Sequence, residues 1–339
     1  MAALTGRARL PRAVGDRWLL VAAVLLLALI AAGPSLIGAG YLRLLTEVLV
    51  VLAMAQMWNL LAGYAGLMSI GHQAFVGVGA YGLFAFSNFT GFSPYWSLFV
   101  APLLCAALAA ALAPVLFRLR DAYFAIGMWV VAEILAILVG KWPLLGRQYG
   151  MTLTGMRALD RDWFQPMTFW LAAGTAFGAI LLVLWLLRSR TGLGLMAVRD
   201  NDLAAASLGI DVWRSRFIAF VLSGAGCGLA GAVYYMSSFQ VVPGSAFDVN
   251  WVVQMLFITI IGGIGRIEGP IIGTLVYFGL REYFVEAGNW YLILMGVVAV
   301  VVMLVAPQGI WGLVSERFGI EVFSTRRRPP VTPSPPAPG

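Results

Sequence analysis

The chain has 339 residues, of which 61% are hydrophobic and only 11% are charged, and its formal net charge is +7. A soluble domain usually has about 25% charged residues, and a water-soluble fold this apolar would expose large apolar patches. The composition therefore excludes an ordinary soluble protein and predicts a chain that crosses a lipid bilayer. Continuous apolar runs of about 20 residues favour helices over the alternating strands of a barrel.

Ten apolar segments follow one another along the chain, each long enough or nearly long enough to cross a bilayer as a helix. We expect them at 18–38, 41–61, 68–88, 95–117, 122–140, 167–187, 217–238, 250–265, 269–286 and 290–306. We expect the first to be a helix of the protein rather than a cleaved leader. The third and the eighth are short and rich in glycine, which is typical of broken or re-entrant helices. The predicted fold is an all-α integral membrane protein with about ten transmembrane helices and an internal inverted repeat.

The distribution of arginine predicts the orientation of these helices, because positive residues favour the cytoplasmic side. Arginine clusters lie within 7–17, 118–120, 188–216 and 317–328. All four fall on one side when ten crossings are counted from a cytoplasmic N-terminus. The segment 141–166 is an exception, because it carries one lysine and three arginines and is expected outside. Since the arginines lie at the ends of apolar runs, the net positive charge indicates topology and not a nucleic-acid partner.

This topology divides the chain into three parts. We expect residues 1–17 to form a cytoplasmic N-terminal segment, 18–313 the transmembrane domain, and 314–339 a cytoplasmic tail. The end of the tail is almost all Pro, Ser, Thr and Ala, so the tail is expected to be disordered from about 324.

The cytoplasmic loop 188–216 contains the signals of a short helix. The acidic and amide residues at 200–202 are good N-caps, the run from Leu203 to Leu208 favours a helix, and Gly209 is a natural helix stop. With both leucines available to fill a groove, the segment has the character of a helix that docks on a partner. A solvated loop with one helical turn is the alternative.

Motifs for catalysis or cofactor binding are missing from the sequence. It has no Gly-x-x-x-x-Gly-Lys-Ser/Thr loop for a nucleotide, and one histidine with two cysteines excludes most zinc sites. The run 77–82 matches a dinucleotide-binding pattern, but it lies in an apolar helix and indicates close helix packing. Cys105 and Cys227 lie in apolar runs, where they are expected to pack as small residues. We therefore expect no enzyme activity, no metal and no cofactor bound by this chain.

Two glycine-rich blocks, 59–81 and 262–273, are typical of places where helices break or approach closely. In the second, three glycines spaced by four predict one face of a helix, and Pro270 is expected to end or kink it. Both blocks are expected to flank a translocation path, and packing alone is the alternative. The candidate residues are Gly63, Gly66, Ser69, Gly71, His72, Gln73, Gly262, Gly263, Gly265, Gly269, Pro270 and Gly273.

Polar residues inside the predicted spans are also candidates, because an ionisable group in a membrane usually faces protein or water. Glu133 lies in the middle of the fifth span and is a candidate for the path or for an interhelical hydrogen bond. His72 is the only histidine. We expect it to fix the broken helix by a hydrogen bond rather than to relay protons.

Three motifs, which are the two glycine-rich blocks and the cytoplasmic loop between them, resemble those of the permease subunits of branched-chain amino-acid ABC importers, of the LivM type. They also follow one another in the same order along the chain. Segment 63–81 is similar to that family's Gly-Tyr-Ala-Gly-x-x-Ser-x-Gly-His signature, segment 199–210 to its cytoplasmic coupling loop, and segment 262–273 to its Gly-Gly-x-Gly-x-x-x-Gly-Pro signature. The resemblance covers about 40–313. Two positions differ: Ala206 lies where the coupling loop is often acidic, and Thr274 where the family often has alanine.

The resemblance implies a non-catalytic, pore-forming subunit for branched-chain or related amino acids, with many crossings of the bacterial inner membrane and both termini in the cytoplasm. The implied partners are a homologous second permease, two cytoplasmic ATPases that bind the ATP, a periplasmic substrate-binding protein and the lipid bilayer. A urea or short-amide permease of the same superfamily and a secondary transporter working alone are the alternatives. The residues implied in coupling to the ATPase are Arg199, Asp200, Asn201, Leu203, Ala204, Ala205, Leu208 and Gly209.

Overall fold

The computed structural model describes residues 12–13, 32–35, 38–154, 161–284, 290–306, 308–318 and 320–321. Most of the expected segment 1–17, most of the first expected span at 18–38 and the tail expected to be disordered lie outside these residues. The described chain is almost entirely helical, as the apolar composition predicts for a protein whose backbone must satisfy its own hydrogen bonds in lipid.

The elements follow one another as helices with short connections. The helices are α2 (Ala39–Asn59), α3 (Gln73–Thr90), α4 (Pro94–Ser97), α5 (Val100–Leu116), α6 (Ala122–Lys141), α7 (Arg161–Arg188), α8 (Arg190–Asp200), α9 (Asp202–Ser207), α10 (Val212–Ser238), α11 (Pro243–Ala246), α12 (Asn250–Gly262), α13 (Glu268–Phe284), α14 (Trp290–Val305) and α15 (Gly309–Phe318). A π-helical turn, Leu60–Tyr64, continues α2. Two-residue strands pair β1 (Arg12–Ala13) with β4 (Ile320–Glu321) in parallel and β2 (Met151–Thr152) with β3 (Gln240–Val241) antiparallel.

Seven helical segments among the described residues are long and apolar enough to cross a membrane, fewer than the ten expected. They are Gly40–Tyr64, Pro94–Leu116, Ala122–Lys141, Trp163–Arg188, Val212–Ser238, Pro243–Gly262 and Ile293–Arg317. The third expected span, 68–88, is missing from this set, because its helix α3 has the required length but is not apolar enough. The ninth, at 269–286, corresponds to α13, whose 17 residues make it short. The internal inverted repeat stays a prediction.

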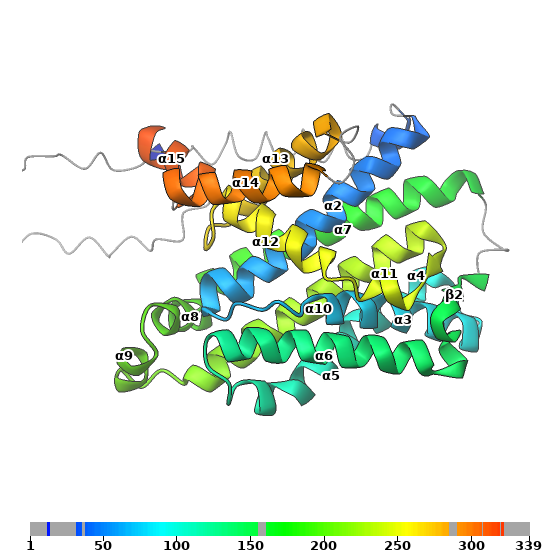
Figure 1. Ribbon diagram of the computed structural model, residues 1–339, viewed down its shortest axis with the longest axis horizontal. Helices are drawn as coiled ribbons and strands as arrows, with labels where there is room; N and C mark the ends of the chain where they lie inside the picture. Colours follow the sequence, from blue (N-terminus) through cyan, green and yellow to red (C-terminus); the bar gives the residue numbers. More distant parts are fainter. Residues whose placement is uncertain are drawn as a thin grey trace, which may run out of the picture.

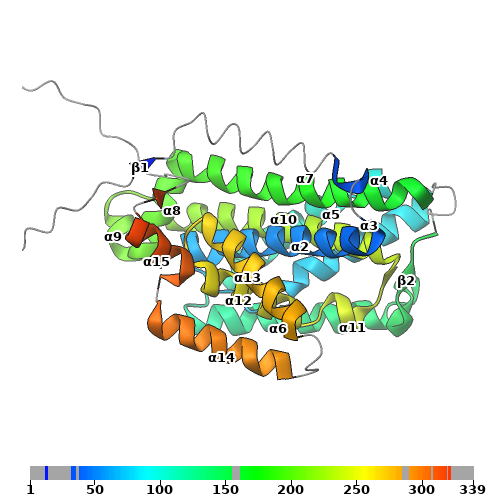
Figure 2. The ribbon, with the colours of Figure 1, turned by 90° about the horizontal axis from the view of Figure 1, so that it is seen from above.

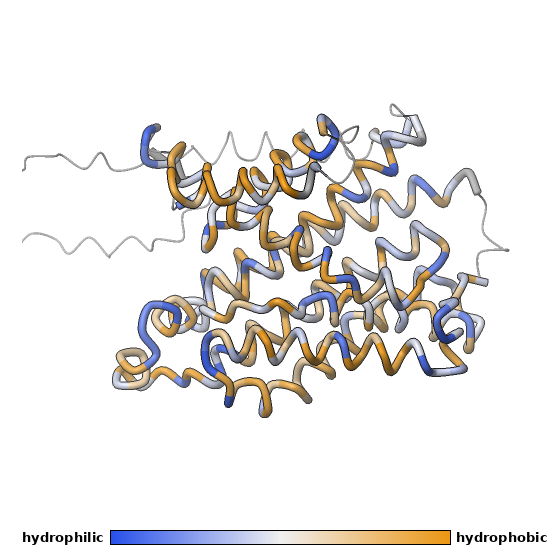
Figure 3. The backbone as a smooth tube through the Cα atoms, viewed as in Figure 1, coloured by the Kyte–Doolittle hydropathy of each residue, from blue (hydrophilic) through white to orange (hydrophobic). Residues whose placement is uncertain are grey.

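Figure 1 shows that the long helices extend along one common direction, with α8 and α9 at one end and β2 at the other. The arginine-bearing turn between α5 and α6 lies at the same end as α8 and α9. The segment that includes β2 lies at the opposite end, although it also carries positive residues. Hydrophilic residues concentrate towards the ends of the helices, while their middle parts are hydrophobic (Figure 3). This separation is what a bundle that crosses a bilayer requires.

Helix α10 occupies the centre of the bundle, where it packs against α2, α3, α5 and α7, and both views place it between the outer helices (Figures 1 and 2). Glycines allow this close approach. A Cβ at Gly79 would overlap the backbone of Gly228 in α10, and a Cβ at Gly77 would overlap the ring of Phe247. The interpretation of the run 77–82 as a close packing site is confirmed.

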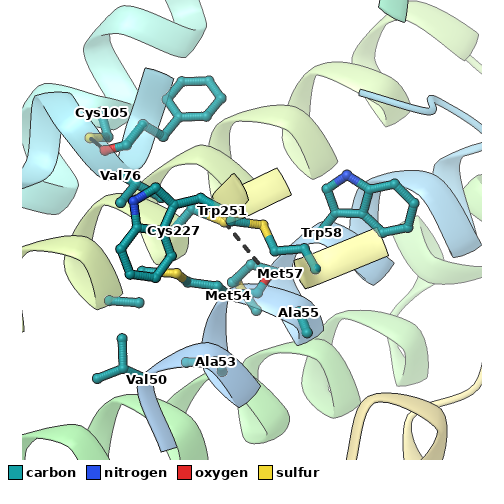
Figure 4. Close-up of a cluster of buried hydrophobic side chains, with 14 of the residues drawn as sticks. Val50, Ala53, Met54, Ala55, Met57, Trp58, Val76, Cys105, Cys227 and Trp251 are labelled. Carbon is teal, nitrogen blue, oxygen red and sulfur yellow. Dashed lines mark hydrogen bonds between the residues drawn. The ribbon is translucent and has the colours of Figure 1, made fainter. Parts of the chain in front are cut away.

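The core that surrounds α10 is apolar and rich in sulfur-containing side chains. Figure 4 shows Met54 and Met57 of α2 beside Cys227 of α10 and Trp251 of α12. The thiol of Cys227 donates to the carbonyl oxygen of Met54 at 3.7 Å. Cys105 donates to the carbonyl oxygen of Phe75 at 3.3 Å, and both thiols are fully buried. The prediction that the cysteines serve as small packing residues is confirmed.

An ion pair joins α2 to α13 within the bundle. The two terminal nitrogens of Arg281 donate to the two carboxylate oxygens of Glu47 at 2.7 and 2.9 Å. The guanidinium also lies over the ring of Phe278, 4.7 Å from its centroid. Such a bidentate pair gives each of the two part-buried charged groups a partner, which is a requirement for keeping them between helices.

Candidate functional site

The first glycine-rich block is a break between two helices. After α2 and its π-helical turn, Gly66 has a φ of 71°, and the chain then runs without helical structure through 66–72 until α3 starts at Gln73. Gln73 is fully buried, and Ser69, Gly71 and His72 before it are also buried. The expected span at 68–88 is therefore a short non-helical segment, 68–72, followed by helix from Gln73.

Polar contacts from neighbouring residues replace the hydrogen bonds that a helix would have made in this extended segment. The indole nitrogen of Trp58 donates to the carbonyl oxygen of Ser69 at 2.8 Å. The amide of Leu67 donates to the carbonyl oxygen of Leu61 at 3.1 Å. The amide of Gly71 donates to the hydroxyl of Ser69 at 3.3 Å. These contacts keep irregular backbone tolerable inside a bundle, where an unpaired backbone group is costly.

His72 ties the start of α3 to α10 and α2. Its Nε2 lies 2.8 Å from the hydroxyl of Ser223, which in turn donates to the carbonyl oxygen of Met57 at 2.7 Å. Because the single hydroxyl hydrogen of Ser223 goes to Met57, the Nε2–H of His72 is the donor in the first bond. The imidazole is fully buried. This geometry favours the structural role expected for the histidine.

We predict that His72→Ala lowers stability without changing the pH dependence of transport. The substitution removes a buried hydrogen bond, which costs about 1–3 kcal/mol. Thermal unfolding of the purified protein measures that loss, and uptake per folded molecule at pH 6 and pH 8 tests a proton relay. Normal stability combined with an altered pH profile would contradict the structural role.

The second glycine-rich block is a tight turn between α12 and α13. Gly263 and Gly265 have φ values of 128° and 73°, a region that disfavours any residue with a Cβ. Gly262 ends α12 next to the backbone of Gly269. A Cβ at Gly273 would overlap the carbonyl group of Ile258. The close approach of two helices that the glycine spacing predicts is therefore present.

Two details of this block differ from the expectation. Gly265 lies in the turn before α13, so only Gly269 and Gly273 share the helix. Pro270 was expected to end or kink a helix, and that prediction is wrong. Pro270 is the third residue of α13. In the first turn of a helix a backbone N–H has no acceptor within the helix, so the N–H that proline lacks is not needed there.

The two blocks meet although they are about 200 positions apart in the sequence. The amide of Gly265 donates to the side-chain oxygen of Asn59 at 2.8 Å, and the side-chain nitrogen of Asn59 donates to the carbonyl oxygen of Arg266 at 2.9 Å. Asn59 is fully buried. Its one amide group therefore joins the end of α2 to the α12–α13 turn.

Arg199, at the end of α8, contacts the same place. Its Nη1 donates to the carbonyl oxygen of Gly63 at 3.0 Å, and its Cα lies beside Gly66. Its other nitrogens bind Asp200 at 2.9 and 3.0 Å. We call the meeting of Asn59, Gly63, Arg199 and Gly265 the junction. It brings together the three motifs that the sequence singles out separately.

The segment beyond the junction contains two helices, where one was expected. Asn201 caps α9 by accepting a hydrogen bond from the amide of Ala204 at 3.0 Å, and Gly209 ends the segment with a φ of 81°. Asp202 pairs with Arg216 of α10 at 2.8 Å. The unexpected helix is α8, whose Gly192 packs against the backbone of Leu187.

The exposed side chains of α9 and of the turn after it are mostly apolar. Leu203 and Leu208 are 82% and 80% exposed, which is unusual for leucine at the end of a bundle. Ala204 is exposed, whereas Ala205 is buried against the rest of the chain. Of the two alanines, only Ala204 can therefore meet a partner directly.

Glu133 does not belong to the junction. It lies on α6 with its side chain exposed, and its Oε1 accepts a hydrogen bond from the indole nitrogen of Trp129 at 3.2 Å. Ser223 was not a sequence candidate, and Asn59 was expected only as a polar residue inside a span, at the start of the first glycine-rich block. The signal for Asn59 was present, because an amide side chain inside an apolar span needs partners.

A bundle of long apolar helices, with two helix breaks joined at one end to a short helical segment, defines a multi-pass membrane protein with an internal junction. The family of the permease component of branched-chain amino acid transport systems matches residues 40–307, and the chain belongs to this family. It is accordingly an ABC transporter permease, a class that works in a complex with other subunits.

Relatives with similar sequences are also named as transport permeases. The high-affinity branched-chain amino acid transport system permease protein LivM of Escherichia coli is 26% identical over 316 residues, covering 85% of this chain and 73% of the relative. A probable branched-chain amino acid permease LivH of Methanocaldococcus jannaschii is 30% identical over 142 residues, covering 39% of this chain and 44% of the relative. A putative glucose ABC transporter permease of Haloferax volcanii is 27% identical over 244 residues, covering 65% and 70%. No solved structure matches the chain.

Proposed function

We propose that this chain is the pore-forming permease subunit of an importer for branched-chain or related amino acids in the bacterial inner membrane. Partner ATPases would supply the ATP hydrolysis, and a homologous second permease and a periplasmic binding protein would complete the transporter. The observation that carries the proposal is the junction, because it links an exposed helical segment directly to both helix breaks. A permease driven by a separate motor needs such a link.

Three features support the placement of the ATPases at the end that carries α8 and α9. The arginine-bearing turn between α5 and α6 lies at this end together with α8 and α9 (Figure 1). The positive-inside rule assigns such an end to the cytoplasm. Leu203 and Leu208 offer apolar side chains to a groove. Arg199 then connects the docked segment to Gly63, so that a displacement of α8 acts on the end of α2.

The proposal is tested by reconstitution of the chain with its genetically neighbouring transport subunits in proteoliposomes. Uptake of labelled leucine, isoleucine and valine is measured with and without ATP. Uptake of labelled urea and glucose is measured in the same way, as the alternative solutes. ATP-dependent uptake of the branched-chain amino acids supports the proposal. Uptake by the purified chain alone, or ATP-dependent uptake of urea or glucose only, would overturn it.

We predict that Ala204→Glu separates ATP hydrolysis from uptake. A carboxylate at this exposed position of α9 would have to enter the apolar groove expected on the ATPase, where an unpaired charge is costly. Hydrolysis by the assembled complex should remain, while uptake falls by about tenfold or more.

The matched control is Ala206→Glu, an identical change two residues along the same helix. Ala206 is also exposed, and related coupling loops are often acidic there, so this variant should transport normally. Equal loss of uptake in both variants would point to general disruption of α9. Normal uptake by Ala204→Glu would remove α9 from the coupling contact.

A further inference from the structure

Helix α6 is the most exposed of the candidate membrane spans. Of the residues in its most apolar stretch, only 22% are buried, compared with 67% for the span that contains α2. Figures 1 and 2 both place α6 at an edge of the bundle. Its inner face packs through small and apolar residues such as Met128 and Ala132, and the outer face is left uncovered by the described chain.

The uncovered face carries one acid in the middle of the helix. Glu133 is the only charged residue of α6 before Lys141 at its end. Its side chain is exposed, and the three ion pairs found within the described residues do not include it. Its partner there is the indole nitrogen of Trp129, one turn earlier. An ionisable group at this depth almost always faces a water-filled path or protein, since hydrocarbon cannot solvate it.

The surroundings of Glu133 are aliphatic. Ile126 and Val130 precede it on the exposed face, Ile137 follows one turn later, and all three are about half exposed. The face therefore combines one negative charge, one aromatic ring and a row of branched aliphatic side chains. A carboxylate beside an indole attracts an ammonium group, through charge and through the face of the ring. The aliphatic row offers an apolar contact to a branched side chain.

We propose that the outer face of α6 lines the solute path, with Glu133 and Trp129 recognising the ammonium group of an amino acid. The side chain of that amino acid lies against Val130 and Ile137. This inference depends on the proposed function, because it places the substrate of that transporter on this face. It assigns a specificity-determining residue within the permease itself, in addition to any selection by a binding protein.

The first experiment measures transport by the full reconstituted complex. Glu133→Gln should lower the uptake rate of a branched-chain amino acid by about tenfold. Basal ATP hydrolysis and co-purification of all subunits should be unchanged, and Glu133→Asp should recover part of the uptake. Glu282→Gln is the matched control, because Glu282 is an exposed acid on a different helix, α13, and should transport normally.

The second experiment tests whether water reaches this face. Glu133→Cys and Ile137→Cys should react with a water-soluble, positively charged methanethiosulfonate in the assembled complex, whereas Ala132→Cys on the buried face should not. The native thiols of Cys105 and Cys227 are fully buried and give a low background.

The outcomes separate this inference from the proposed function. Unchanged uptake by Glu133→Gln, or no reaction at position 133 in any nucleotide state, would overturn the assignment while leaving the permease function intact. Loss of subunits from the Glu133→Gln complex would also overturn it, because Glu133 would then hold the partner permease. Failure of the wild-type complex to transport amino acids with ATP would instead refute the proposed function.

Discussion

Gly71→Ala is expected to prevent the normal packing of α6 on the broken helix. A Cβ at this position would overlap the carbonyl group of Met128 and lie 2.7 Å from the amide nitrogen of Trp129. These are backbone atoms of α6, so no side-chain rotation relieves the clash and the helix itself must move. Overpacking of this kind costs about 1–3 kcal/mol or more. Because α6 also carries Glu133, transport should fall together with stability.

The measurement is thermal unfolding of the purified protein in detergent, where the midpoint should drop by about 5 °C or more. Gly174→Ala in α7 is the matched control, since a Cβ there meets no atom within 4 Å. Alanine favours a helix over glycine by about 1 kcal/mol, so this control should be as stable as the wild type or slightly more stable. A Gly71→Ala protein with wild-type stability and uptake would show that α6 moves freely relative to the extended segment.

Asn59→Leu is expected to open the junction. Leucine has a similar shape but leaves the amide of Gly265 and the carbonyl of Arg266 without the partner that Asn59 provides. A fully buried group left unsatisfied costs about 1–3 kcal/mol; both of these bonds are part-buried, so the two together should lower stability by about 1–3 kcal/mol. The α12–α13 turn would then separate from the end of α2, and hydrolysis should continue with little uptake.

Two further variants sharpen this test. Asn59→Asp keeps the acceptor for Gly265 but loses the donor to Arg266, so its unfolding midpoint should lie between those of the wild type and Asn59→Leu. Asn88→Leu is the matched control. Asn88 also makes several hydrogen bonds, to Thr152 and Thr154, but at an exposed site where water can replace them. An equal loss of stability in Asn59→Leu and Asn88→Leu would contradict the importance of burial at the junction.

Local sequence signals predicted the local features of this chain well. The capping residue Asn201 and the stop at Gly209 define the start and the end of α9 as expected, because both act within a few residues of their own position. The apolar runs likewise predicted most of the long helices. Helix α8 was not predicted, because its two glycines, Gly192 and Gly194, weaken the local helix signal. Close contacts with other parts of the chain explain why glycine lies at these positions.

Features that depend on distant contacts could not be predicted from the sequence. Hydropathy does not distinguish an apolar helix from the partly buried, non-helical segment before His72, because the contacts that satisfy its backbone come from residues such as Trp58. The glycine blocks were each expected to break or pack helices. Their meeting through Asn59 joins residues 206 positions apart, which no local pattern encodes.

The ion pair between Glu47 and Arg281 has a consequence for the biogenesis of the protein. The two residues are 234 positions apart, and a ribosome adds about 5–20 residues per second, so α13 is synthesised roughly 10–50 s after α2. During that interval the acid of α2 is at the membrane before its basic partner exists. We therefore expect helix α2 to stay beside the insertion machinery until α13 emerges.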